Sequence, residues 1–169
     1  AAGGTVDLYN SPLPIFSLYL FYSIAGITDD AVILGSLFWT FAAAVLLLIF
    51  ARHLFKKLIP ALCAFVIYCL NPGVIESVFS GLPLGLLSFL LLAFTLVYYF
   101  RKRNSLYWTG TLGILSGLLY LTEYDYLILF IPLAVVVTLD SESKKWRHLV
   151  ALICGFIVIS LPWWIRNMA

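Results

Sequence analysis

Long uncharged runs separated by short charged segments dominate the chain and determine its predicted fold. A helix needs about 20 residues to cross about 30 Å of hydrocarbon, because each residue adds about 1.5 Å. Six runs reach or approach this length: residues 31–51, 58–75, 77–100, 104–122, 126–139 and 149–165. Within the third run, the turn-forming segment 81–83 indicates that the helix begins near Pro83. The pattern predicts an all-α, polytopic transmembrane helical bundle with about six spans.

A further apolar stretch, residues 8–28, contains Pro12 and Pro14, which confine its helix to about residues 14–25. Such a helix is too short to span a bilayer comfortably. Its aromatic residues, which include Phe16 and Tyr19, suit the membrane–water interface. We therefore expect an amphipathic juxtamembrane helix that lies in one membrane surface, with a seventh span as the alternative.

The whole chain, residues 1–169, is interpreted as a single membrane domain. Residues 1–30 form a loop with the surface helix, and residues 31–169 form the six transmembrane helices. The chain opens on Ala-Ala-Gly-Gly and stops soon after a long apolar run. We therefore expect it to be an internal fragment of a larger membrane protein.

The charged residues alternate from loop to loop and predict an orientation. Nine of the ten basic residues follow the first, third and fifth runs: Arg52, Lys56, Lys57, Arg101, Lys102, Arg103, Lys144, Lys145 and Arg147. Six of the eight acidic residues lie in the other loops: Asp7, Asp29, Asp30, Glu76, Glu123 and Asp125. By the positive-inside rule the basic loops are cytoplasmic and the acidic loops extracytoplasmic. The membrane is a bacterial or archaeal cell membrane or the endoplasmic reticulum.

Composition agrees with a membrane location. The chain is 63% hydrophobic and only 11% charged, with a mean hydropathy of +1.06. Soluble domains carry about 25% charged residues, and no soluble fold of this size could bury so much apolar surface. Ten basic against eight acidic residues leave no large basic excess, which excludes a nucleic-acid partner. Membrane lipids are the expected surroundings.

Three carboxylates on the acidic side are candidates for chemistry. Glu76 follows Asn71-Pro72-Gly73 in a predicted loop, either as a solvated carboxylate or at the rim of a cavity. Glu123 and Asp125 lie in the short link between the fourth and fifth spans. They could bind a cation or a sugar hydroxyl, or they could be hydrated turn residues.

Arg166 is the one basic residue that this topology assigns to the acidic side. It follows Trp163 and Trp164, so it is either an interfacial anchor or a ligand for phosphate. As an anchor it could also pair with Glu123 or Asp125. No role is predicted for His53 or His148.

Two other features predict structure and not chemistry. Asp29 and Asp30 are expected to cap the helix that starts at Ala31. Gly110, Gly113 and Gly117 place small residues along one helix face, where they favour close helix packing.

Several short segments share their order and spacing with one enzyme family. They are Ser11-Pro12-Leu13-Pro14 followed by an aromatic-rich helix and Ala25-Gly26, then Ala51-Arg52-His53-Leu54-Phe55, Asn71-Pro72, the glycine-containing segment 113–122 that ends in Leu121-Thr122, and Ser160-Leu161-Pro162-Trp163 with Arg166-Asn167. Together they resemble the GT-C-type glycosyltransferases. This family includes the protein O-mannosyltransferases and the aminoarabinose transferases that modify lipid A.

The resemblance implies transfer of a sugar from a polyprenyl-phosphate carrier to an acceptor hydroxyl on the extracytoplasmic face. The acceptor would be a lipid, a glycan or a protein. In this family a carboxylate in the first extracytoplasmic loop acts as the base, and basic residues hold the leaving phosphate. Of the residues on this face, Arg166, Glu123, Asp125 and Glu76 are the candidates for binding the substrate.

Two departures from the family pattern change what the resemblance implies. The family has Arg or Lys directly after Leu-Thr, where this chain has Glu123. An acidic residue is also common in the family just before the third span, where this chain reads Gly81-Leu82-Pro83-Leu84. The family's catalytic carboxylate also lies several tens of residues before the prolines, which would be upstream of Ala1. Asp7 is the only acid left in that loop, and the chain alone is expected to be inactive.

No cofactor is evident from the residues, and a dependence on a divalent metal is left open. A non-catalytic membrane scaffold or a transporter subunit is the alternative function. A transporter should bury ionisable residues in mid-span, whereas every charge here lies at the end of a predicted span.

Overall fold

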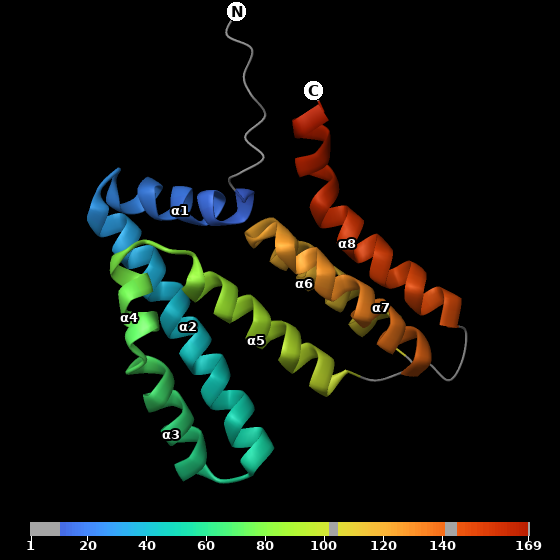
Figure 1. The fold of residues 1–169 in the computed structure, drawn as a ribbon, viewed down its shortest axis with the longest axis horizontal. Helices are drawn as coiled ribbons and strands as arrows, with labels where there is room; N and C mark the ends of the chain where they lie inside the picture. Colours follow the sequence, from blue (N-terminus) through green and yellow to red (C-terminus); the bar gives the residue numbers. More distant parts are fainter. Residues whose placement is uncertain (1–10, 102–104, 141–144, 169) are drawn as a thin grey trace, which may run out of the picture. The chain divides into compact units, whose positions relative to one another are not determined.

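The structure, a computed structural model, describes residues 11–101, 105–140 and 145–168. Within these ranges it contains eight α-helices and one 3-10 turn, and the chain is all-α there (Figure 1). Two helices are long and apolar enough to cross a membrane, and a bent helix pair could form a third crossing. Shorter apolar helices accompany them. The described part of the chain thus has the helices of a membrane protein. Asp7 lies outside it.

The helices group into two compact units, one of residues 14–100 and one that contains the described residues from 101 to 168. The first unit, here the N-terminal unit, contains α2 (Asp29–Phe55), α3 (Leu58–Cys69), α4 (Pro72–Phe79) and α5 (Leu84–Phe100). α5 begins directly after Pro83, as the sequence predicts. It runs parallel to α2, because the ring pairs Trp39–Phe89 (5.2 Å) and Phe50–Tyr99 (5.7 Å) follow the same order on both helices.

The start of α2 differs in detail from the prediction. Thr28 is the N-cap, and its hydroxyl accepts a hydrogen bond from the backbone N–H of Ala31 at 3.3 Å. Asp29 and Asp30 lie in the first helical turn instead of capping it. Their negative charge still stabilises this end, because the N-terminus of a helix carries a positive partial charge.

The run 58–75 does not form one straight helix. α3 ends at Cys69, and α4 leaves it at a bend of 49°. The break has a local cause: Asn71 is extended, its side-chain oxygen accepts from Gly73 N–H at 2.9 Å, and Pro72 follows at the first helical position. Glu76 therefore lies in α4 and not in a loop, which corrects the sequence prediction.

Helix α1 (Pro12–Ala25) crosses the beginning of α2 (Figure 1). The Trp39 indole N–H donates to the Ser17 hydroxyl at 2.5 Å, and Phe21 packs against Phe38 with 5.7 Å between ring centroids. The short helix is as expected, but its amphipathic character is wrong, since large apolar side chains also cover the face turned away from α2. These exposed residues are Ile15, Phe16, Tyr19, Leu20 and Ile24.

The C-terminal unit contains α6 (Leu106–Thr122), the 3-10 turn Tyr124–Tyr126, α7 (Leu127–Asp140) and α8 (Lys145–Met168). α6 and α8 pack closely and run parallel. A Cβ atom built on Gly113 would lie 2.1 Å from the Leu152 carbonyl oxygen, and one on Gly117 3.1 Å from that of Phe156. The predicted packing role of these glycines is confirmed. α8 adds Gly155, where a Cβ atom would lie 2.4 Å from the Gly110 carbonyl oxygen.

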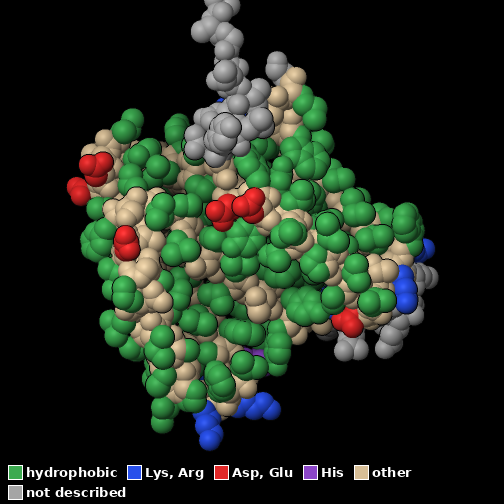
Figure 2. Space-filling view, in the orientation of Figure 1, with side chains coloured by type: hydrophobic (Ala, Val, Ile, Leu, Met, Phe, Trp, Pro, Cys, Tyr) green, Lys and Arg blue, Asp and Glu red, His purple; other side chains and the backbone are tan. Residues whose placement is uncertain are grey.

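α7 connects α6 to α8 along the chain and contacts α8 through the ring pair Phe130–Phe156, with 4.6 Å between centroids. Asp140, the last residue of α7, forms an ion pair with Arg101. α8 continues through Pro162 to Met168, so Arg166 lies in its last turn. Exposed apolar side chains cover much of the surface (Figure 2), as expected for a protein surrounded by lipid.

Candidate functional site

Opposite charges lie at the two ends of the N-terminal unit (Figure 2). Asp29 and Asp30 open α2, while Arg52 lies in its last turn. Asp30 and Arg52 are separated by about 33 Å along the helix, at 1.5 Å per residue. Lys56 and Lys57 follow Arg52 in the link to α3. Glu76 is exposed on α4, which leads back toward the acidic end, where Gly81 approaches Val32.

In the C-terminal unit the candidate site consists of the link between α6 and α7 and the end of α8. Glu123 terminates α6, and Asp125 lies in the 3-10 turn; both side chains are exposed. Arg166 is also exposed, on the last turn of α8. The Trp163 indole N–H donates to the Tyr124 hydroxyl at 3.0 Å, which joins the end of α8 to the link.

The contact that the structure gives the Arg166 side chain is with the aromatic ring of Trp163 and not with a carboxylate. Its guanidinium carbon lies 5.2 Å from the centroid of the Trp163 ring, which is a cation–π arrangement. Among the described residues, no ion pair joins Arg166 to Glu123 or Asp125. The structural bridge considered from the sequence is therefore not formed between these described residues. Arg166 lies beside a tryptophan, and its roles as an interfacial anchor or as a ligand for phosphate stay predictions.

A second tryptophan, Trp164, also joins the end of α8 to α6. The Trp164 indole N–H donates to the Tyr120 hydroxyl at 3.1 Å, and the Tyr120 ring lies 5.6 Å from that of Phe156 and 5.3 Å from that of Tyr124. We call Tyr120, Tyr124, Phe156, Trp163 and Trp164 the aromatic cluster. The sequence interpretation missed it. Its signal was two tyrosines, Tyr120 and Tyr124, at and just after the end of the fourth apolar run, together with two adjacent tryptophans whose indole N–H groups need acceptors.

The surroundings of the link change the pKa of one of its tyrosines, Tyr126. Burial, and to a smaller extent the nearby Glu123 carboxylate, raise the pKa of the Tyr126 hydroxyl above its usual value of 10. Both effects disfavour the phenolate. Tyr126 therefore stays protonated at neutral pH and can donate a hydrogen bond to an oxygen ligand at this surface.

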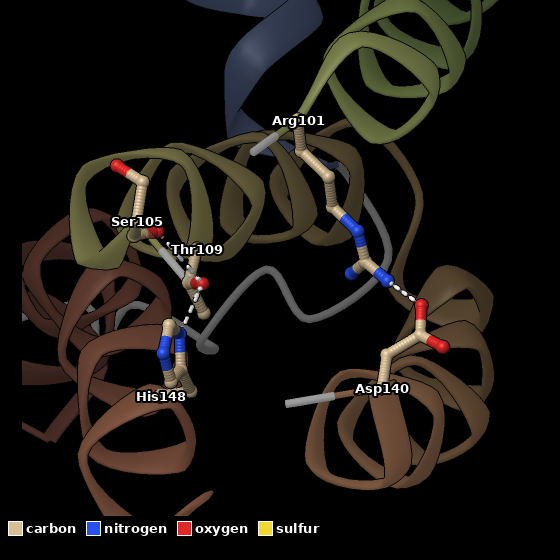
Figure 3. A network of polar contacts seen from close by, with 5 residues as sticks. All are labelled: Arg101, Ser105, Thr109, Asp140 and His148. Carbon is tan, nitrogen blue, oxygen red and sulfur yellow. Dashed lines mark hydrogen bonds and ion pairs between the residues drawn. The ribbon is translucent and has the colours of Figure 1, made fainter. Parts of the chain in front are cut away.

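The opposite end of the C-terminal unit contains a polar network (Figure 3). His148 is 3% exposed, and its Nδ1 atom lies 2.9 Å from the Thr109 hydroxyl oxygen. The same hydroxyl donates to the Ser105 carbonyl oxygen at 3.3 Å. Because a hydroxyl has one proton, this arrangement requires His148 to donate from Nδ1. His148, which had no predicted role, joins α8 to α6.

The structure thus brings Arg166, Glu123 and Asp125 to one end of the C-terminal unit, whereas Glu76 belongs to the N-terminal unit. The described residues contain no group of three or more His, Cys, Asp or Glu side chains that could hold a metal ion. No protein-family model, curated protein or solved structure matches this chain.

Proposed function

We propose that this chain is part of a GT-C-type glycosyltransferase that moves a sugar from a polyprenyl-phosphate carrier to an acceptor hydroxyl. The observation that supports this best is the end of α8. There an exposed arginine lies on the ring of Trp163, and the Trp163 indole is hydrogen-bonded to Tyr124 in the link that carries two exposed carboxylates. Guanidinium, carboxylate and aromatic groups are the ones that a phosphate-linked sugar needs: a cation for the phosphate, acceptors for the hydroxyls and a flat surface for the ring.

The membrane arrangement is part of the proposal. In it α2, the bent pair α3 and α4, α5, α6, α7 and α8 are six spans, and α1 lies at the extracytoplasmic surface. The link with Glu123 and Asp125 then faces the outside of a bacterial or archaeal cell membrane, or the lumen of the endoplasmic reticulum. A lipid-linked donor reaches this surface without leaving the bilayer.

The arginine, the two carboxylates and the base have different tasks in the proposed reaction. Arg166 neutralises the phosphate as the bond between the sugar and the phosphate breaks. Glu123 and Asp125 accept hydrogen bonds from sugar hydroxyls. The base that takes the proton of the acceptor hydroxyl lies outside the described residues, with Asp7 as the candidate within this chain.

Donor binding tests the proposal. The full chain, purified in detergent micelles, is titrated with decaprenyl phosphate while tryptophan emission is recorded, because Trp163 lies against Arg166. Arg166→Lys removes the planar fork but keeps the charge, and it should weaken binding about tenfold. The melting temperature should not change, since Arg166 is exposed.

Two controls make the result specific. Arg147→Lys, at the other end of α8, should bind decaprenyl phosphate like the unmodified chain. Decaprenol, which lacks the phosphate, should bind both proteins weakly. Equal affinity of Arg166→Lys and the unmodified chain for decaprenyl phosphate would refute the phosphate contact.

Cysteine labelling tests the topology separately. In a chain whose three cysteines are replaced by alanine, Lys57→Cys and Glu123→Cys should react with a membrane-impermeant maleimide from opposite sides. Labelling of both positions from one side would disprove the six-span arrangement.

A further inference from the structure

A cavity of about 600 Å³ lies at the basic end of the N-terminal unit, where α2 turns into α3. Its polar lining comes from Arg52 and His53 in the last turn of α2 and from the two link residues, Lys56 and Lys57. Its apolar lining comes from Ile49, Leu58 and Phe100. From this cavity we infer a binding site for the phosphate headgroup of an anionic phospholipid, independent of the proposed sugar transfer.

Charge is the first support. Arg52, Lys56 and Lys57 contribute three cations, and no acidic side chain among the described residues lines the cavity. The only ion pair found in the described part of the chain, Arg101–Asp140, involves none of these three residues. Their positive charge is therefore available to a ligand.

The backbone adds to this charge. Lys57 is the N-cap of the 12-residue helix α3, and no side chain accepts a hydrogen bond at that cap. The first turn of a helix has N–H groups without helical acceptors and a positive partial charge. Phosphate oxygens are suitable acceptors for such groups. Leu58, the first residue of α3, also lines the cavity.

The apolar side of the cavity favours a lipid over a free phosphate ion. Ile49, Leu58 and Phe100 are 52%, 52% and 41% exposed, so they offer hydrocarbon contacts next to the cations. The His53 ring is held against Phe100, with 4.4 Å between centroids, and against Tyr99, at 5.7 Å. An anionic phospholipid has both parts that this surface needs, a phosphate and acyl chains. Basic residues that follow a membrane helix are a known setting for such headgroups.

Lipid binding to the full chain in neutral detergent tests the site. The probe is phosphatidylglycerol with a photoreactive acyl chain, and competition by unlabelled phosphatidylglycerol gives the affinity. Lys56→Gln combined with Lys57→Gln should weaken binding about 30-fold, from the usual contribution of two basic residues near an anionic lipid. Lys145→Gln combined with Arg147→Gln removes two cations elsewhere and should leave binding unchanged. The crosslinked peptides should include residues 49–58.

The other outcomes also decide the question. Equal competition by phosphatidylcholine would show a purely apolar site, and competition by millimolar inorganic phosphate would show a site for a soluble anion. Either result would overturn the proposal, as would unchanged binding in the Lys56/Lys57 variant. If that variant fails to fold, Arg52→Gln combined with Lys57→Gln replaces it, with the same expected loss.

Discussion

Replacing Gly113 by alanine tests whether contact between the α6 and α8 backbones holds the C-terminal unit together. The new Cβ atom would lie 2.1 Å from the Leu152 carbonyl oxygen, 3.0 Å from its carbonyl carbon and 3.1 Å from the Phe156 nitrogen. All three are backbone atoms of α8, which cannot move aside as a side chain can. The helices must therefore separate by about 1 Å, which weakens the dispersion contacts along the whole interface.

The size of the effect follows from two opposing terms. Alanine is favoured over glycine inside a helix by about 1 kcal/mol. Overpacking typically costs about 1–3 kcal/mol, and three backbone contacts at or below 3.1 Å justify the upper end. We expect Gly113→Ala to lower the free energy of unfolding by about 2 kcal/mol, which is about 30-fold in the unfolding equilibrium.

Gly110→Ala is the matched control on the same helix. Its Cβ atom would meet only the Ala151 carbonyl oxygen, at an ordinary 3.9 Å. This variant should therefore keep the helix-propensity gain and be as stable as the unmodified chain or more so. Titration with SDS, followed by tryptophan emission, measures both. Equal stability of the two variants would refute the close backbone contact between α6 and α8.

Two further predictions concern the polar contacts drawn in Figure 3, which lie in the C-terminal unit. Asp140→Asn should lower the free energy of unfolding by about 2 kcal/mol, because the Arg101 side chain, only 8% exposed, loses its charged acceptor; unchanged stability in the SDS titration would contradict this. Thr109→Val should cost about 1 kcal/mol, because His148 loses its interhelical partner. A double-mutant cycle with His148→Phe should then show non-additive losses, and additive losses would mean that the two side chains do not interact.

The sequence predicted those elements that depend on hydrophobic length and on helix-stopping residues. Pro12 and Pro14 place the start of α1, and Pro83 that of α5, because proline favours the first turn and its missing N–H is not needed there. The close contact along Gly113 and Gly117 was also readable, since glycines at this spacing share one helix face. Each of these signals lies within one short stretch of sequence, although the glycines alone do not indicate that their partner helix is α8.

Some of the features that were missed have local causes, and others depend on packing between distant segments. The break at Asn71 interrupts a run whose hydropathy is continuous, and only the capping side chain and Pro72 explain it. The partner of Arg166 could not be chosen from the sequence, which offered Glu123, Asp125 and a neighbouring tryptophan on equal terms. The hydrogen bond between His148 and Thr109 joins residues 39 positions apart, and no periodicity indicates such a pair.

Lys56, in the turn between α2 and α3, adds a positive charge to the cavity but adopts a backbone conformation that is unfavourable for lysine. It has a φ of 53°, the left-handed conformation that ends many helices and that glycine adopts without strain. A lysine there costs about 1 kcal/mol relative to glycine. Lys56→Gly should therefore relax the backbone and raise the stability of the N-terminal unit, while removing one cation from the cavity. A selection for thermal stability alone would favour this exchange, and the proposed lipid site predicts that the resulting protein binds anionic lipid less tightly.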